Sequence, residues 1–361
     1  MENRSLRVGA YSLISAVCAA VFKLSILPSL VSADAGRDAW ISVTVIAALE
    51  IITLVPVVFV SFHGGLQAIK EKYGNIVYIA IIVPIIAVLM IKTLVYLAEV
   101  NSFCGSYLFY NESVENVGIV FSIAAAFIAV TGIKGISRAA TIALWSIPLI
   151  FIVGLAFGEP AADFSKLLPV GVTGLKGFAG IDNGLFFTFD MAPLMLISAG
   201  ENDEKLSQGT VFSVTGVIYV LIILFFAAFT AVFGGAYYLS PHALSSMGSF
   251  NVVNTEIGAV DWPAIVAWLS FALIQISLQI WAVTAALTPL GFKPKITALV
   301  AAAVAATSGF IFKNIEKTLI FAESMVKYFT VGIAVVCAVV AAILIKIKVG
   351  TVRGAEYAAN I

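Results

Sequence analysis

The chain has 361 residues, of which 61% are hydrophobic and 11% charged, and its mean hydropathy is +1.08. A soluble domain carries about 25% charged residues, so this composition predicts an integral membrane protein in a lipid bilayer. The net charge is zero and there is no basic block, which argues against nucleic acid as a partner. The three cysteines form no disulfide or metal-binding pattern, and no cofactor or metal is expected.

Ten apolar segments follow one another, each close to the ~20 residues that cross a bilayer. We therefore predict an all-α polytopic membrane protein with about ten transmembrane helices, forming one transporter-like domain over residues 1–361. Residues 347–361 are expected to form a short cytoplasmic tail. The predicted spans are 8–32, 40–62, 76–100, 117–133, 138–158, 177–199, 210–233, 263–290, 295–312 and 318–346.

Basic residues predict the orientation, because cytoplasmic loops are enriched in Lys and Arg. The loops 101–116 and 234–262 contain neither residue type, which indicates that they lie outside. Both termini are therefore expected in the cytoplasm. The basic residues on that side would be Arg4, Arg7, Lys70, Lys72, Lys134, Arg138, Lys205, Lys293, Lys295, Lys346, Lys348 and Arg353.

The sixth segment, Gly177–Ser198, differs from a plain spanning helix. Three glycines are expected to loosen its first half, Pro193 removes a backbone donor in its second half, and Asp190 lies between. A carboxylate at membrane depth usually faces a bundle interior or a water-filled cavity. The segment therefore predicts a broken helix with a ligand site, and the alternative is a kinked helix whose Asp190 caps its second half.

The first segment is also interrupted, with Lys23 deep inside it and Pro28 near its outer end. Segments one and six correspond if the chain consists of two five-helix halves, at about 8–158 and 177–346. Paired interrupted segments of this kind indicate an inverted-repeat transporter site. We therefore predict a five-plus-five inverted repeat with broken helices 1 and 6.

Two further groups of polar residues recur at helical spacing within spans. Lys92, Tyr96 and Glu99 share a face of the third segment, and Gln275 and Gln279 share a face of the eighth. The first group forms either the wall of a polar cavity or an ion pair that ties two helices together. The second provides interhelical hydrogen bonds or lines the same cavity.

The stretch Leu27–Ser42, LPSLVSADAGRDAWIS, resembles the segment that follows the first helix in the B subunits of spore germination receptors, the GerAB-like family. The shared pattern is Leu-Pro, then Ala-Gly, then Asp-Ala-Trp-Ile-Ser. Weaker similarity continues at Asp163–Pro169 and at Trp262, which opens the eighth segment. The matching positions are Leu27, Pro28, Ala35, Gly36, Asp38, Ala39, Trp40, Ile41 and Ser42.

This resemblance implies a LeuT-like ten-helix bundle of the amino acid–polyamine–organocation superfamily. Germination-receptor members bind a nutrient germinant, often an amino acid, in the inner spore membrane, beside a membrane A subunit and a C-type lipoprotein. In the superfamily, helix one unwinds at Gly-rich positions, whereas this chain has Lys23 in a stretch without glycine. Lys23 therefore either replaces a coupling cation or binds the ligand carboxylate, or it pairs with Asp190 or Glu99 and fills the site.

The favoured hypothesis is a germinant-receptor subunit that binds a small polar ligand, such as an amino acid, and passes a helix-bundle movement to its partner subunits. The alternative is a proton- or cation-coupled amino acid permease in which Asp190 or Glu99 takes up the proton. A ligand-gated channel component is the third hypothesis, and no enzymatic motif is present. The candidate ligand-binding residues are Lys23, Tyr96, Glu99, Phe187, Thr188, Asp190, Gln275 and Gln279.

Overall fold

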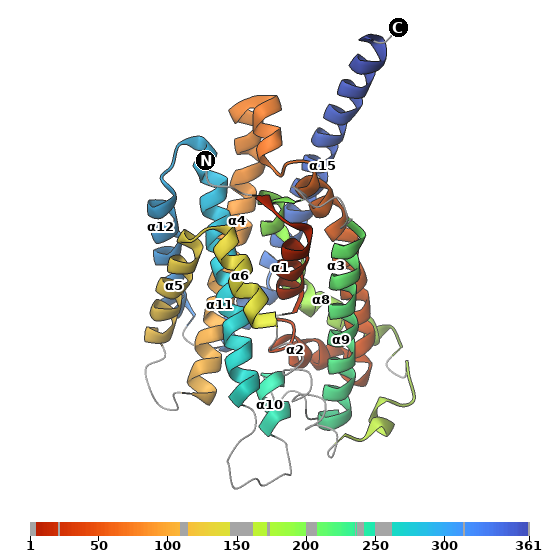
Figure 1. Cartoon of the computed structure of the whole chain (residues 1–361). Helices are drawn as coiled ribbons and strands as arrows, with labels where there is room; N and C mark the ends of the chain where they lie inside the picture. The colour runs from red at the N-terminus through yellow and green to blue at the C-terminus, as the bar shows by residue number, and fades with distance from the viewer. Residues whose placement is uncertain are drawn as a thin grey trace.

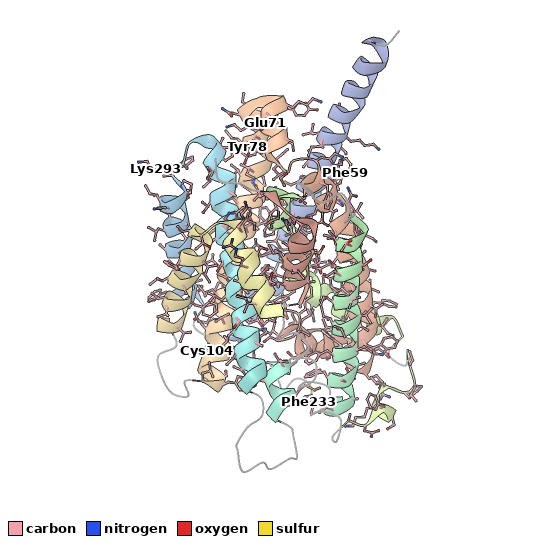
Figure 2. All side chains as sticks on the ribbon, in the orientation of Figure 1. Phe59, Glu71, Tyr78, Cys104, Phe233 and Lys293 are labelled. Carbon is pink, nitrogen blue, oxygen red and sulfur yellow. The ribbon has the colours of Figure 1, made fainter. Side chains whose placement is uncertain are left out.

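The chain folds into a bundle of helices (Figure 1). The computed structural model describes residues 5–20, 22–108, 115–144, 162–171, 174–199, 208–234, 236, 242–249, 262–312 and 315–359. The strand at the start of the chain and the C-terminal part of α15 lie at one end of the bundle, and α10 lies at the other. Figure 2 shows Glu71 and Lys293 toward the first end and Cys104 and Phe233 toward the second. The prediction of an all-α polytopic membrane protein is confirmed.

The first half of the chain contains β1 (Ser5–Leu6), α1 (Val8–Ala20), α2 (Leu27–Ala35), η1 (Gly36–Asp38), α3 (Ala39–Phe62), α4 (Gln67–Tyr107), α5 (Glu115–Val130) and α6 (Ile133–Leu144). The second half contains η3 (Phe164–Leu167), η4 (Gly174–Phe178), α8 (Gly180–Gly184), η5 (Leu185–Phe187), η6 (Ala192–Leu196), β2 (Ser198–Ala199), α9 (Gln208–Phe233), α10 (Ala243–Ser249), α11 (Trp262–Leu287), η8 (Thr288–Leu290), α12 (Pro294–Ala306), α13 (Ser308–Ile311), α14 (Ile315–Glu323) and α15 (Val326–Ala359).

Long apolar helices form because the hydrocarbon region offers no water to backbone groups, and a helix satisfies them internally. Five stretches among the described residues are long and apolar enough to cross a membrane, namely Leu27–Phe62, Gln67–Tyr107, Gln208–Phe233, Ile265–Leu290 and Val326–Ile347. Helices α5 and α6 bend by 117° relative to each other, which separates the predicted fourth and fifth spans. The rest of the fifth span, from residue 145 to 158, lies outside the described residues.

The first span is broken as predicted. Helix α1 ends at Ala20, residues 22–26 form turns, and α2 resumes at Leu27. Pro28 lies in the first turn of α2, where proline is tolerated because its missing N–H would have no helical partner there. Lys23 therefore lies on unwound chain between two half-helices.

The sixth span is broken as well. Helix α8 ends at Gly184 and is followed by η5, which ends at Phe187, and η6 begins at Ala192. Between them Phe189 has φ of 62°, a left-handed conformation that is uncommon for a residue other than glycine. Such strained residues cluster at functional sites, and Asp190 follows directly.

Spans one and six are paired at one end of the bundle. Strand β1, just before span one, pairs in parallel with β2 at the end of span six, with Ser5 opposite Ser198 and Leu6 opposite Ala199. At the other end, α2 packs against α8. Spans one and six are therefore held together on both sides of their breaks, by a strand pair on one side and by two half-helices on the other.

The Leu27–Ser42 stretch contributes to this arrangement by holding span six in place. Asp38 Oδ1 accepts a hydrogen bond from the Gly171 N–H at 3.1 Å, and Ser42 Oγ donates to the Gly177 carbonyl at 2.5 Å. Gly36, with φ of 59°, turns the chain between α2 and α3. The stretch that resembles germination receptors thus positions the first half of span six.

Two glycines of α8 also serve close packing, which was not expected from the sequence. A Cβ added at Gly180 would lie 2.6 Å from Val31 Cγ1 and 2.7 Å from the Val31 carbonyl oxygen. A Cβ at Gly184 would lie 2.5 Å from Ile46 Cδ1. Both glycines therefore let α8 approach α2 and α3.

We expect Gly180→Ala to destabilise the protein by about 1–3 kcal/mol, because the new methyl group would overlap a backbone oxygen that cannot rotate away. Thermal unfolding of the purified protein in detergent measures the effect. Gly216→Ala in α9 is the matched control, because no atom lies within 4 Å of its added Cβ. Equal unfolding temperatures for the two variants would contradict the packing role of Gly180.

Helix α15 extends past the predicted span. It runs without interruption to Ala359, so most of the region expected as a tail, residues 347–361, continues the last helix. Figure 1 shows this part of α15 projecting beyond the bundle. Its location in the cytoplasm and the repeat boundaries at residues 8–158 and 177–346 stay predictions.

Candidate functional site

Asp190 is the centre of a buried ionic cluster between the two breaks. Its side chain is 1% exposed. Oδ1 accepts hydrogen bonds from Lys92 Nζ at 2.7 Å and from the Tyr96 hydroxyl, and Oδ2 accepts one from Lys23 Nζ at 3.1 Å. Two cations and one phenol thus converge on a single carboxylate, which compensates the cost of removing its charge from water.

Lys92, on α4, also fills the break in span six. Its ammonium donates to the backbone oxygen of Phe186 at 2.9 Å and to that of Thr188 at 2.6 Å. These oxygens are available because the chain is unwound there and offers no helical N–H partner. Nζ lies 5.4 Å from the ring centroid of Phe186 and 5.8 Å from that of Tyr96, within cation–π range.

Lys23 bridges two carboxylates from different spans. Besides Asp190 at 3.1 Å, Nζ forms an ion pair with Glu50 Oε2 at 3.2 Å, and all three side chains are buried. The sequence analysis missed Glu50, which lies on α3. Glu50 could have been predicted from the sequence, because it is an isolated carboxylate within the apolar segment 40–62. A carboxylate at membrane depth usually faces the bundle interior, which is the rule that pointed to Asp190.

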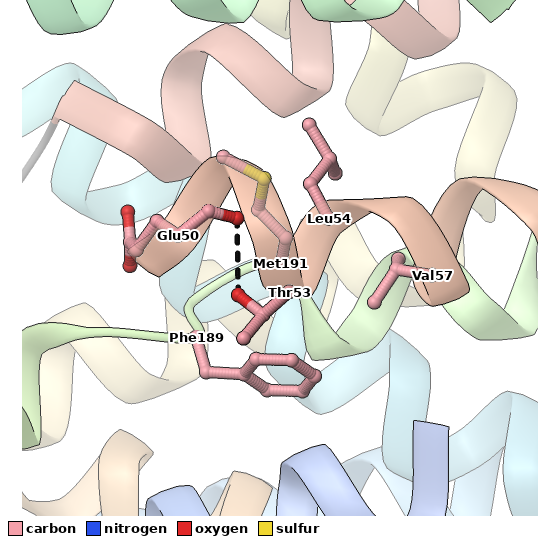
Figure 3. A pocket seen from close by; sticks show the side chains of 6 residues that line it. All are labelled: Glu50, Thr53, Leu54, Val57, Phe189 and Met191. Carbon is pink, nitrogen blue, oxygen red and sulfur yellow. Dashed lines mark hydrogen bonds between the residues drawn. The ribbon is translucent and has the colours of Figure 1, made fainter. Parts of the chain in front are cut away.

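The space beside the cluster is narrow. A small hollow of about 160 Å³ lies there, and Figure 3 shows Phe189 and Met191 facing α3 across it. Thr53 Oγ1 donates to the Glu50 carbonyl at 3.0 Å. The residues that line the hollow are Glu50, Thr53, Leu54, Val57, Phe189 and Met191.

Aromatic rings form one wall of the cluster. Tyr96 stacks on Phe22 with ring centroids 3.9 Å apart, and Phe187 lies 6.1 Å from Tyr96 in a stacked orientation. Phe22 meets Trp268 of α11 edge to face at 6.1 Å. Spans one, three, six and eight therefore all contribute side chains around the two breaks.

The two glutamines of α11 contact different parts of the bundle. Gln275 Nε2 donates to the backbone oxygen of Asp190 at 3.4 Å and thus touches the break in span six. Gln279 Oε1 accepts from Thr93 Oγ1 of α4 at 2.7 Å, one helical turn away from Gln275. Gln275 belongs to the cluster, whereas Gln279 links α11 to α4.

The remaining two candidate residues also differ in position. Thr188 presents its carbonyl to Lys92, while its hydroxyl donates to the Leu185 carbonyl at 2.7 Å. Glu99 is buried but is not an ion-pair partner of Lys23 or Lys92; its carboxyl faces Ser25 and the backbone amide of Ile26. Of the two acidic partners predicted for Lys23, Asp190 forms the ion pair and Glu99 does not.

No family model and no curated protein matches the sequence. Among solved structures the chain is similar to MhsT in complex with L-phenylalanine, with a TM-score of 0.65 and 15% sequence identity. The match covers 92% of this chain and 87% of that chain. The protein thus has the LeuT fold, as the resemblance of Leu27–Ser42 implied.

Proposed function

We propose that this protein binds a small zwitterionic ligand, of the amino acid class, at the ionic cluster of Lys23, Lys92, Glu50 and Asp190. The observation that carries the proposal is the position of the cluster on two facing helix breaks, where unwound backbone and paired charges are available to a ligand. The ammonium group of the ligand would bind the oxygens that now accept from Lys92, and the carboxylate group of the ligand would bind either lysine.

We further propose that the protein is a sensor, a B-type subunit of a nutrient germinant receptor in a spore membrane. The buried ion pairs support this, because Lys23 and Lys92 are already paired with Glu50 and Asp190, so a ligand that binds either lysine has to break an existing pair. Binding would then be coupled directly to a rearrangement of spans one, three and six, provided the two arrangements differ in ligand affinity. The resemblance of Leu27–Ser42 adds A-type and lipoprotein C-type subunits as the proposed recipients of that movement.

A cation-coupled amino acid permease is the second candidate. It is favoured by the buried carboxyl groups Glu50 and Glu99, which suit proton uptake within the bundle, and by the fold shared with MhsT. The two candidates use the same cluster and differ in whether the ligand crosses the membrane.

Equilibrium binding and uptake of labelled amino acids, including L-phenylalanine, separate the two candidates. The purified protein is reconstituted into proteoliposomes with and without an imposed proton gradient. If the protein is a sensor, we expect saturable binding without accumulation of the ligand inside the vesicles. Accumulation driven by the proton gradient would contradict the sensor and favour the permease. Absence of binding by any amino acid, in protein that is folded and inserted, would contradict the ligand class itself.

A further inference from the structure

Glu99 is a buried carboxyl group without a cationic partner among the described residues. Its residue is 1% exposed, and neither carboxylate oxygen has a hydrogen bond of normal geometry there. It approaches the Ser25 hydroxyl and the Ile26 backbone amide, both on the unwound part of span one. An isolated carboxylate is very costly in such a place, and the group avoids that cost by holding a proton.

The other titratable groups near Glu99 do not compensate its charge. Asp190 approaches from the break in span six and would repel an ionised Glu99, and Tyr96 lies one turn away on α4. Asp190 and Tyr96 are hydrogen-bonded to each other, because the Tyr96 hydroxyl donates to Asp190. Lys23 and Lys92 are paired with Asp190 and Glu50.

A chain of polar contacts leads from Glu99 toward the α10 end of the bundle. Ser25 Oγ lies 3.3 Å from Nδ1 of His242, the residue that precedes α10, and the Ala243 N–H donates to the Ser25 carbonyl at 2.8 Å. His242 Nε2 has no hydrogen-bond partner among the described residues. Ser25 thus lies between the carboxyl of Glu99 and a buried imidazole whose Nε2 has no partner in the described part of the chain.

Rings from α4 hold His242 in this position. Phe103 and Tyr107 meet the imidazole edge to face at 5.3 and 5.7 Å, and Tyr107 is within 3.3 Å of Ser246 on α10. Burial lowers the pKa of His242 to about 4, so at neutral pH the ring is uncharged. A neutral imidazole both accepts and donates a proton, as a relay requires.

We propose that Glu99 is a proton-binding site that exchanges its proton with the buried His242 through Ser25. When Nε2 of His242 takes up a proton, Nδ1–H passes its proton to Ser25 Oγ as the Ser25 hydroxyl proton moves to the Glu99 carboxylate. The reverse sequence releases it. This site is distinct from the ionic cluster and stands whether the protein senses or transports its ligand.

Infrared spectroscopy of the wild-type protein in lipid bilayers tests the site without any ligand. At neutral pH we expect a C=O stretching band of a protonated carboxylic acid, lost in Glu99→Gln and retained in Glu50→Gln. Glu99→Asp should shift the band, which covers the case in which Glu99→Gln does not fold. Absence of the band in the wild type, or its full persistence in Glu99→Gln, would overturn the proposal.

The relay is tested by transferring the same samples into heavy water and following the shift of the band with time. His242→Gln should slow this exchange roughly 100-fold or more, in line with the loss of a positioned proton donor. His63→Gln is the matched control, because the His63 ring binds the Phe59 carbonyl away from Glu99. Exchange in His242→Gln at the wild-type rate would remove His242 from the route.

Discussion

Replacing Lys23 with methionine is expected to lower the free energy of unfolding by about 3–5 kcal/mol, because it leaves a buried carboxylate without its partner. Asp190 keeps Lys92, so the loss falls mainly on Glu50, whose ion pair with Lys23 measures 3.2 Å. Methionine has nearly the length of lysine, which limits the contribution of a cavity. Thermal unfolding in detergent or in lipid nanodiscs measures the change.

A double-mutant cycle assigns this loss to a partner. Adding Glu50→Gln to Lys23→Met should recover more than half of the lost stability, since the uncompensated charge is then removed. Glu99→Gln is the control partner, because Glu99 faces Ser25 rather than Lys23. The ion-pair arrangement would be contradicted if Glu50→Gln and Glu99→Gln recovered equal stability in the Lys23→Met background. It would also be contradicted if Glu50→Gln recovered none.

Asp190→Asn is expected to weaken ligand binding by about 2–5 kcal/mol, or roughly 30- to 5,000-fold in Kd, while the protein stays folded. The fold survives because Lys92 retains two backbone oxygens and Lys23 retains Glu50. The ligand site is weakened, because the ammonium group of the ligand loses the carboxylate oxygen that holds Lys92 in the present arrangement.

Binding of a labelled amino acid to wild type and variant, with unfolding temperatures measured in parallel, checks this expectation. Gln279→Leu is the matched control within the bundle, since Gln279 bonds to Thr93 and not to the break in span six. It should leave Kd close to the wild-type value. A Kd unchanged by Asp190→Asn would remove Asp190 from the ligand site.

The architecture was predictable because it depends on local signals. Segment length and hydropathy predicted the spans, and the interruptions around Lys23 and Asp190 predicted both broken helices. The same rule, that a charge at membrane depth requires a partner, pointed to Asp190 and Lys92. It applied equally to Glu50, although the helix around Glu50 carries no break.

Pairing between elements was harder to predict, because it depends on distances across the bundle. Lys92, Tyr96 and Glu99 share one face of α4, yet the first two contact Asp190 and the third contacts Ser25. A few ångströms along the helix axis decide which break each residue reaches. His242 lies outside the predicted spans, and its burial depends on α10 packing near Phe103 and Tyr107.

A structure of the protein with a bound amino acid tests the central claim most directly. The account predicts ligand density between the two breaks, with Lys23 Nζ or Lys92 Nζ moved beyond hydrogen-bond reach of Asp190, from 3.1 and 2.7 Å in the present arrangement. Ligand density elsewhere, with both ion pairs intact, would contradict it.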